Sequence, residues 1–168
     1  MSQQIVSVSG RSSSRAVVTE EYTQYITVQV GRQLCGFSVM TVQDVLRPHK
    51  IAHIPLAPEE VAGSLNLRGR IVTAIDLRLR MDVELTEKNK KAEDCMSVVV
   101  EHQGELYSLL VDSVGEVLTL PDKGIEKTPA TLESHWRSMS KGVYRLEDKL
   151  LVILDVHSLL DFAVTSAH

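Results

Sequence analysis

Residue types that commonly carry chemistry are present in this chain, but few are spaced to work together. The six histidines lie at positions 49, 53, 102, 135, 157 and 168. Only His49 and His53 have the i, i+4 spacing that places two ligands on one helical face, and prolines flank them with no acidic residue between. We interpret them as solvated loop histidines, and no metal is expected.

Nucleophilic and phosphate-binding patterns are not found either. Neither Cys35 nor Cys95 has a candidate base beside it, and no serine lies in a nucleophile elbow. Gly63 and Gly69 lie in a hairpin pattern, not at a helix entrance where backbone N–H groups bind phosphate. The chain is therefore expected to be non-catalytic, with no cofactor.

One pair of opposite charges is a better candidate for function. Asp44 lies in the apolar segment 42–45, and Arg68 lies in the stretch 63–77. If the two segments pack together, these residues can form an ion pair on an apolar rim. The pair is either an ordinary surface pair worth at most about 1 kcal/mol or a bidentate pair that orients a binding groove.

The stretch 63–77 predicts a strand, a tight turn and a second strand. It begins in alternating register, turns at Gly69-Arg70 and leaves as an apolar run. Arg68 is then at the shoulder of the turn. Asp76 follows the run and can cap a short helix that begins at Leu77.

The second half of the chain repeats the first. Residues 63–77 correspond to 142–156 at a constant offset of 79, and residues 42–45 correspond to 114–117 at an offset of 72. The sequence therefore predicts two copies of a small β unit with about five strands each. Closing each copy into a barrel would leave no unpaired strand edges.

The composition fits this architecture. The chain has 168 residues, of which 43% are hydrophobic and only 4% aromatic, and a net charge of -4. A core of Val, Leu and Ile favours strands. Because two lone cysteines define no disulfide framework and no leader or apolar run of about 20 residues is found, we expect a cytoplasmic protein.

The domain organisation follows from these patterns. Residues 1–20 and 163–168 are expected to be tails around one folded region, 21–162. Subdomain 1 is expected at about 21–81 and subdomain 2 at about 95–162. The charged segment 82–94 is either a linker or a surface loop. A helix capped by Asp155 should close the second subdomain.

The segments 42–45 and 66–69, with the run into 76–78, resemble the CheW family of chemotaxis coupling proteins, as do residues 111–117 and 142–155. The resemblance implies an all-β fold with short helices, namely two five-stranded SH3-like barrels and a C-terminal helix. It also implies a non-catalytic scaffold or adaptor in a two-component system. The family couples the cytoplasmic tips of chemoreceptors (methyl-accepting chemotaxis proteins) to the histidine kinase CheA in chemoreceptor arrays.

The resemblance further implies two binding surfaces. The receptor contacts, in a groove that receives a helical tip, would be Val42, Arg68, Asp44, Val39, Leu67, Val114 and Val117. Asp44 stands where the family usually has Glu, so a longer ion pair or a shifted backbone is expected. For Val39, Leu67, Val114 and Val117, ordinary core is the favoured alternative, because apolar residues in strands are usually buried.

The kinase contacts are implied less directly. Trp136 or Leu132 would meet the C-terminal regulatory domain of CheA, because the family uses an aromatic residue in the loop before the strand at 142. Trp136 can equally cover the terminal helix.

Two alternatives remain open. An isolated CheA regulatory domain has the same fold. A small β-barrel that binds single-stranded nucleic acid is another class, which needs aromatic platforms and a basic groove. The low aromatic content and negative charge disfavour it, so nucleic acid is not an expected partner, and neither is direct membrane insertion.

Overall fold

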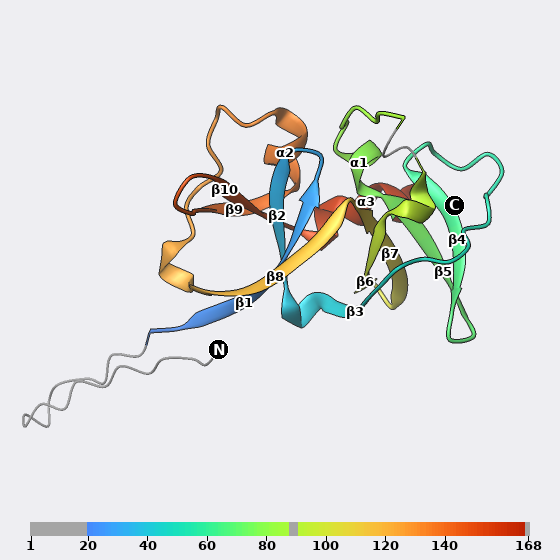
Figure 1. Cartoon of the computed structure of the whole chain (residues 1–168), viewed down its shortest axis with the longest axis horizontal. Coiled ribbons are helices and arrows are strands. Elements are labelled where there is room, and N and C mark those ends of the chain that lie inside the picture. Colours follow the sequence, from blue (N-terminus) through green and yellow to red (C-terminus); the bar gives the residue numbers. More distant parts are fainter. Residues whose placement is uncertain (1–19, 88–90, 167–168) are drawn as a thin grey trace, which may run out of the picture.

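The computed structural model describes residues 20–87 and 91–166. Ten strands in these ranges form two five-stranded sheets (Figure 1). Sheet A has the order β8 (Ser113–Pro121), β1 (Tyr22–Val30), β2 (Gln33–Ser38), β10 (Leu150–Leu154), β9 (Ser140–Arg145). Sheet B has the order β3 (Val42–Leu46), β6 (Met96–His102), β7 (Glu105–Val111), β5 (Arg70–Asp76), β4 (Val61–Leu67).

The helices are short and lie between or after the strands. They are α1 (Leu77–Arg80), α2 (Ser134–Met139) and α3 (Val156–Ser166), with 3-10 turns η1 (Val39–Thr41), η2 (Ala92–Asp94) and η3 (Asp122–Gly124). In Figure 1 sheet A lies on the left, sheet B on the right, and α3 runs between them. The expected all-β architecture with short helices is confirmed. Neither sheet is closed in the described part of the chain, so each is an open, barrel-like sheet.

Each sheet takes strands from both halves of the chain. The hairpin β1–β2 joins β8, β9 and β10, while the hairpin β6–β7 joins β3, β4 and β5. The two sheets therefore do not coincide with the expected subdomains 21–81 and 95–162. The first hairpin of each subdomain lies in the sheet formed by the remaining strands of the other subdomain. The exchange depends on two parallel pairs, β2 with β10 and β5 with β7. Parallel partners are joined by long crossover connections, so local hairpin patterns cannot reveal which copy supplies them.

The strand register confirms the duplication. Raising or lowering every strand number by five converts the order of sheet A into that of sheet B. Val42 pairs with Val100 in sheet B, and the residues offset by 72, Val114 and Val28, pair in sheet A. A bulge follows each of these pairs. Equivalent residues thus occupy equivalent places, which allows the two copies to be compared residue by residue.

Two glycines mark a second shared bulge. Gly63 and Gly142 have φ of +147° and +156°, and each lies in a register shift between the last two strands of its copy. A Cβ on Gly142 would lie 2.7 Å from the carbonyl oxygen of Glu126. A Cβ on Gly63 would collide with the carbonyl oxygen of Ala52. Both positions require glycine because the neighbouring backbone approaches too closely for any side chain.

The main core fills the space between the sheets. It contains Phe37 of sheet A and Leu109 of sheet B, and Leu159 and Leu160 of α3 are fully buried in it. The expected terminal helix is therefore confirmed, and it covers the core of both sheets. The two cysteines are buried free thiols, and burial raises the pKa of both, that of Cys95 to about 12.

Candidate protein-interaction site

The tip of the β4–β5 hairpin carries the candidate recognition cation. Arg68 and Gly69 have positive φ of +52° and +86°, and the Asn66 side-chain oxygen accepts the N–H of Gly69 at 2.9 Å. Two consecutive positive φ values are typical of a type I′ hairpin turn. The turn is Arg68-Gly69, one residue earlier than expected, so Arg68 is part of the turn itself and is not on its shoulder.

Arg68 and Asp44 form the predicted ion pair. The distance from Arg68 Nη2 to Asp44 Oδ2 is 3.0 Å, with the side chains 80% and 25% exposed. Asp44 Oδ1 accepts the backbone N–H of Val45 at 2.8 Å, which fixes the carboxylate. The ion pair is a single contact between β3 and the β4–β5 turn, which belong to opposite edges of sheet B. The contact is not bidentate, so its energy is that of an ordinary exposed pair, while the Arg68 side chain stays open to a partner.

The apolar residues predicted around this pair differ in burial. Val39 in η1 and Val117 on β8 are 36% and 48% exposed, which is high for valine. Val42 and Val114 are partly buried against the main core. Leu67 packs instead on a separate cluster around Leu65 and Val72. The exposed valines are available to a partner, whereas Val42, Val114 and Leu67 serve partly as core.

A cavity is formed by residues that closely follow Asp44 and closely precede Arg68 in the chain. It measures about 290 Å³ and is lined by the end of β3, the following loop and the end of β4, including Leu46, Leu65 and Leu67. Arg47 and Lys50 are exposed on its rim, and no acidic side chain of the described residues lines it. The surface around Arg68 is therefore hollowed, apolar at its base and cationic at its edge.

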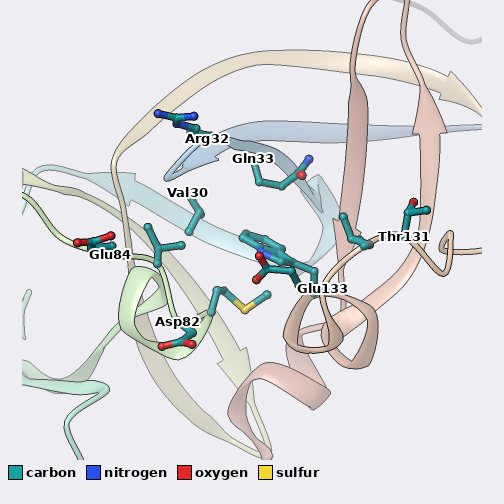
Figure 2. Close-up of a pocket in the computed structure, with 11 residues that line it drawn as sticks. Val30, Arg32, Gln33, Asp82, Glu84, Thr131 and Glu133 are labelled. Carbon is teal, nitrogen blue, oxygen red and sulfur yellow. The ribbon is translucent and has the colours of Figure 1, made fainter.

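The predicted kinase residues lie at a different place. Trp136 in α2 is 7% exposed and belongs to the main core, while Leu132 is partly buried against the same cluster. Both line a cavity of about 380 Å³, whose lining also includes Arg32 and Glu133 (Figure 2). Trp136 therefore packs in the core and also forms part of a cavity wall.

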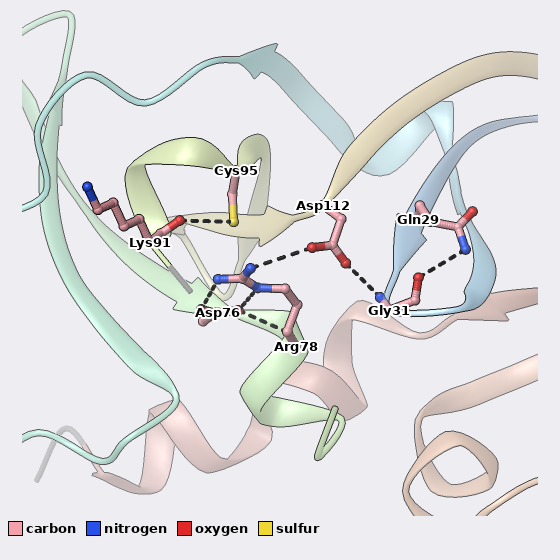
Figure 3. A network of polar contacts seen from close by, with 7 residues as sticks. All are labelled: Gln29, Gly31, Asp76, Arg78, Lys91, Cys95 and Asp112. Atoms are coloured by element: carbon pink, nitrogen blue, oxygen red, sulfur yellow. Dashed lines mark hydrogen bonds and ion pairs between the residues drawn. The ribbon is translucent and has the colours of Figure 1, made fainter. Parts of the chain in front are cut away.

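A buried polar network was not predicted from the sequence. Arg78 is 1% exposed, donates from Nε and Nη2 to the two carboxylate oxygens of Asp76, each at 2.9 Å, and lies 3.5 Å from Asp112 (Figure 3). Asp112 Oδ2 accepts the N–H of Gly31 at 2.6 Å. The network thus connects α1 and β5 of sheet B to the β1–β2 turn of sheet A.

The electrostatics of Arg78 depend on Asp76. Burial lowers the pKa of Arg78, but the hydrogen bonds and charge of Asp76 outweigh it and raise the pKa above its ordinary value. Asp76 Oδ1 also accepts the backbone N–H of Arg78 at 3.0 Å, which confirms the predicted helix cap at Leu77. The sequence did contain a signal for this pair, namely a carboxylate, Asp76, two residues before Arg78 at the start of a helix.

The described ranges contain no group of three His, Cys, Asp or Glu side chains placed to hold a metal ion. Among the same residues, no helix is long and apolar enough to cross a membrane.

The fold and the surface define a class of protein. The β4–β5 hairpin tip carries an exposed ion pair, and a cavity with exposed cations lies at the end of β3. Val39 and Val117 are exposed elsewhere on the surface. Such exposed apolar and charged side chains are typical of a protein-interaction module. The CheW-like domain model matches residues 24–164, and the chain belongs to this family of chemotaxis scaffold or adaptor proteins.

Individual relatives agree with the family. The chain is 26% identical over 149 residues to a chemotaxis protein CheW of Helicobacter pylori, covering 89% of this chain and 88% of the relative. It is 27% identical over 135 residues to that of Rhizobium meliloti, covering 80% and 85%. The crystal structure of the scaffolding protein TtCheW from Thermoanaerobacter tengcongensis superposes with a TM-score of 0.72 at 29% identity, covering 83% of this chain and 88% of that one.

Proposed function

We propose that this protein is a non-catalytic adaptor that couples chemoreceptors to a histidine kinase of the CheA type. The observation that carries the proposal is the Asp44–Arg68 ion pair at a hairpin tip, in a chain of the CheW-like family that also exposes Val39 and Val117. The adaptor would be recruited from the cytoplasm to receptor arrays at the membrane through its partners.

The receptor surface would combine the ion pair with the apolar residues of η1, β3 and β8. Arg68 is 80% exposed at its side chain, so it can contact a partner without leaving Asp44. Val39 and Val117 supply exposed apolar area. A helical receptor tip would bury these valines, while Val42, Leu67 and Val114 shape the floor. This is recognition of a helix in a groove.

The kinase surface would involve Leu132 and Trp136 at the cavity below α2. Trp136 is almost fully buried, so it would support the surface from beneath and offer only an edge. Leu132 is more exposed and lies on the same wall. The regulatory domain of the kinase would contact this wall rather than the Arg68 hairpin, so both partners can bind at the same time.

The proposal is tested with the full chain, a cognate CheA and a receptor cytoplasmic fragment. We expect pull-down of each partner separately, and an increase in kinase autophosphorylation only when adaptor and receptor fragment are both present. A chain that binds neither partner, or that stimulates the kinase without receptor, would contradict the proposal.

A further inference from the structure

A cavity of about 270 Å³ lies in sheet A, where the start of β1 and the end of β2 meet the junction of β10 with α3. Thr23, Ser38, Thr41, Lys141, Ile153 and Asp155 are among the residues that line it. This cavity is distinct from the two cavities beside the proposed receptor and kinase surfaces, since it shares no lining residue with them.

The duplication shows what occupies the equivalent place in sheet B. Asp155 corresponds to Asp76 at the offset of 79, and Thr23 corresponds to Cys95 at the offset of 72. Between Asp76 and Cys95 lies the guanidinium of Arg78 (Figure 3). The cavity in sheet A is therefore the counterpart of a space that an arginine side chain fills in sheet B.

Sheet A lacks that arginine. The residue equivalent to Arg78 is His157, which is exposed and has its ring centroid 5.2 Å from that of His102. The residue equivalent to Asp112 is Met40, which is 88% exposed. The second copy has thus kept the carboxylate of Asp155 while the space next to it remains open.

The hydrogen bonds around the cavity leave acceptors and few donors. The hydroxyl of Thr23 donates to Asp122 Oδ1 at 2.6 Å, and that of Thr41 donates to the Ser38 carbonyl at 2.8 Å. Each hydroxyl oxygen keeps lone pairs after donating its proton. Asp155 accepts from Ser158 at Oδ2, which leaves Oδ1 available. A ligand that only donates hydrogen bonds fits such a lining.

The charges of the side chains that line the cavity also favour a cationic ligand. Asp155 is half-buried, whereas Lys141 is exposed. The ammonium of an exposed lysine is screened by water, so its repulsion of a cation costs less than the partly buried carboxylate gains. Asp76 shows in sheet B that one carboxylate can cap a helix and bind a guanidinium together.

We propose that this cavity receives the guanidinium of an arginine side chain that a partner protein presents. A guanidinium has five N–H donors and no acceptor, which matches the acceptors of Thr23, Thr41 and Asp155. The second carboxylate of the sheet B network is Asp112, and Met40 replaces it in sheet A. The partner's guanidinium is therefore held more weakly than the guanidinium of Arg78 is held in sheet B, and it binds reversibly. The inference stands independently of the receptor and kinase surfaces.

The test is an NMR titration of the ¹⁵N-labelled full chain with Nα-acetyl-arginine N-methylamide, which mimics an arginine within a peptide. The matched control is the citrulline derivative, a neutral urea of nearly the same shape. We expect saturable shifts of the amides of Thr23, Thr41 and Val156 with a Kd on the order of millimolar. The citrulline derivative should bind at least about tenfold more weakly.

Three variants locate the site. Asp155→Asn should weaken binding of the arginine derivative about tenfold, and Lys141→Gln should strengthen it about two- to threefold. Ser38→Leu introduces the residue that sheet B carries at this position, Leu110, and should block the cavity while leaving Asp155 unchanged. It also removes the Ser38 hydroxyl that accepts the N–H of Met40 at the start of η1. A native spectrum of Ser38→Leu keeps the test valid if Asp155→Asn unfolds α3.

Several results of these titrations would contradict the proposed arginine site. Equal binding of the citrulline derivative, shifts that ignore these variants, or no saturable shift in the wild-type chain would overturn the proposal. Free arginine that binds much more tightly than the blocked derivative would overturn the partner protein as the source, since a free amino acid would then be the ligand.

Discussion

Arg78 and Asp76 are two residues apart in the chain and face each other through two hydrogen bonds of 2.9 Å, with side chains 1% and 4% exposed. Such a buried pair contributes little to stability compared with apolar residues, but removing one partner leaves an uncompensated buried charge. Through Asp112 and the N–H of Gly31, this pair also connects sheet B to the β1–β2 turn of sheet A.

Arg78→Met should therefore lower the free energy of unfolding by about 3–5 kcal/mol. Urea unfolding followed by circular dichroism measures the change. Arg78→Lys should also destabilise the protein, because an ammonium cannot reproduce the two parallel hydrogen bonds to Asp76. Arg68→Met is the control, since its exposed ion pair is worth at most about 1 kcal/mol. Equal stability of Arg78→Met and wild type would mean that the network is dispensable.

The two tight backbone positions give a second prediction. Gly142→Ala should cost about 2–3 kcal/mol, because φ is +156° and the new Cβ would lie 2.7 Å from the Glu126 carbonyl oxygen. Gly69→Ala, at φ of +86° with no atom within 4 Å of the new Cβ, should cost only about 1 kcal/mol. Thermal and urea unfolding of both variants separate close packing from backbone strain. Similar costs at the two sites would show that packing is not the cause.

Much of the fold could be predicted because its signals are local. The apolar run after Gly63, the capping carboxylate Asp76 and the repeat of both in the second half are visible in consecutive residues. The exchange of hairpins is not local. It depends on pairing such as Ala74 with Ser108, residues 34 positions apart in a parallel pair, which no turn or periodicity encodes.

The candidate site was predicted in part. Arg68 and Asp44 could be paired because their charges sit in otherwise apolar segments, and the structure brings them to 3.0 Å. The turn was misplaced by one residue because Arg68 itself adopts a positive φ, which only Asn, Asp or Gly would have signalled. Arg78 was missed as a core residue because arginine is rarely buried, and its partner Asp112 lies 34 residues away.

His102 gives a pH prediction. Burial and then the nearby His157 lower its pKa, although Asp161 and Asp155 oppose this. The pKa of the folded protein lies below the ordinary 6.5, so the unfolded chain binds the proton more readily and stability falls as pH falls below 6.5. His102→Gln should reduce this loss as the pH falls below about 6.5. NMR titration should also show a pKa for His102 below the ordinary value.

The control for that experiment is His135→Gln, because His135 is exposed on α2. This variant should keep the pH dependence of the wild-type chain. His157→Gln removes the imidazole whose charge interaction lowers the pKa of His102, and it should raise that pKa toward its ordinary value. A pH dependence that is the same in the wild type and in His102→Gln would assign the loss of stability to other groups.

Arg68 is expected to matter for receptor binding and not for the fold. Arg68→Ala should leave the free energy of unfolding within about 1 kcal/mol of wild type and weaken binding of a receptor cytoplasmic fragment about tenfold, as truncation of an interface arginine commonly does. Arg145→Ala is a matched control, because Arg145 forms an exposed ion pair with Glu126 at the same distance of 3.0 Å on the other sheet. Its receptor binding should be unchanged.

A double-mutant cycle with Asp44→Ala then separates two roles of Arg68. If Asp44 only orients the guanidinium toward the receptor, the loss in the double variant should be close to that of Arg68→Ala alone, because Asp44 acts through Arg68. Purely additive losses would show that both charges contact the receptor separately. If circular dichroism shows that Arg68→Ala unfolds the chain, the type I′ turn or the ion pair is structural, and the recognition role of Arg68 is wrong.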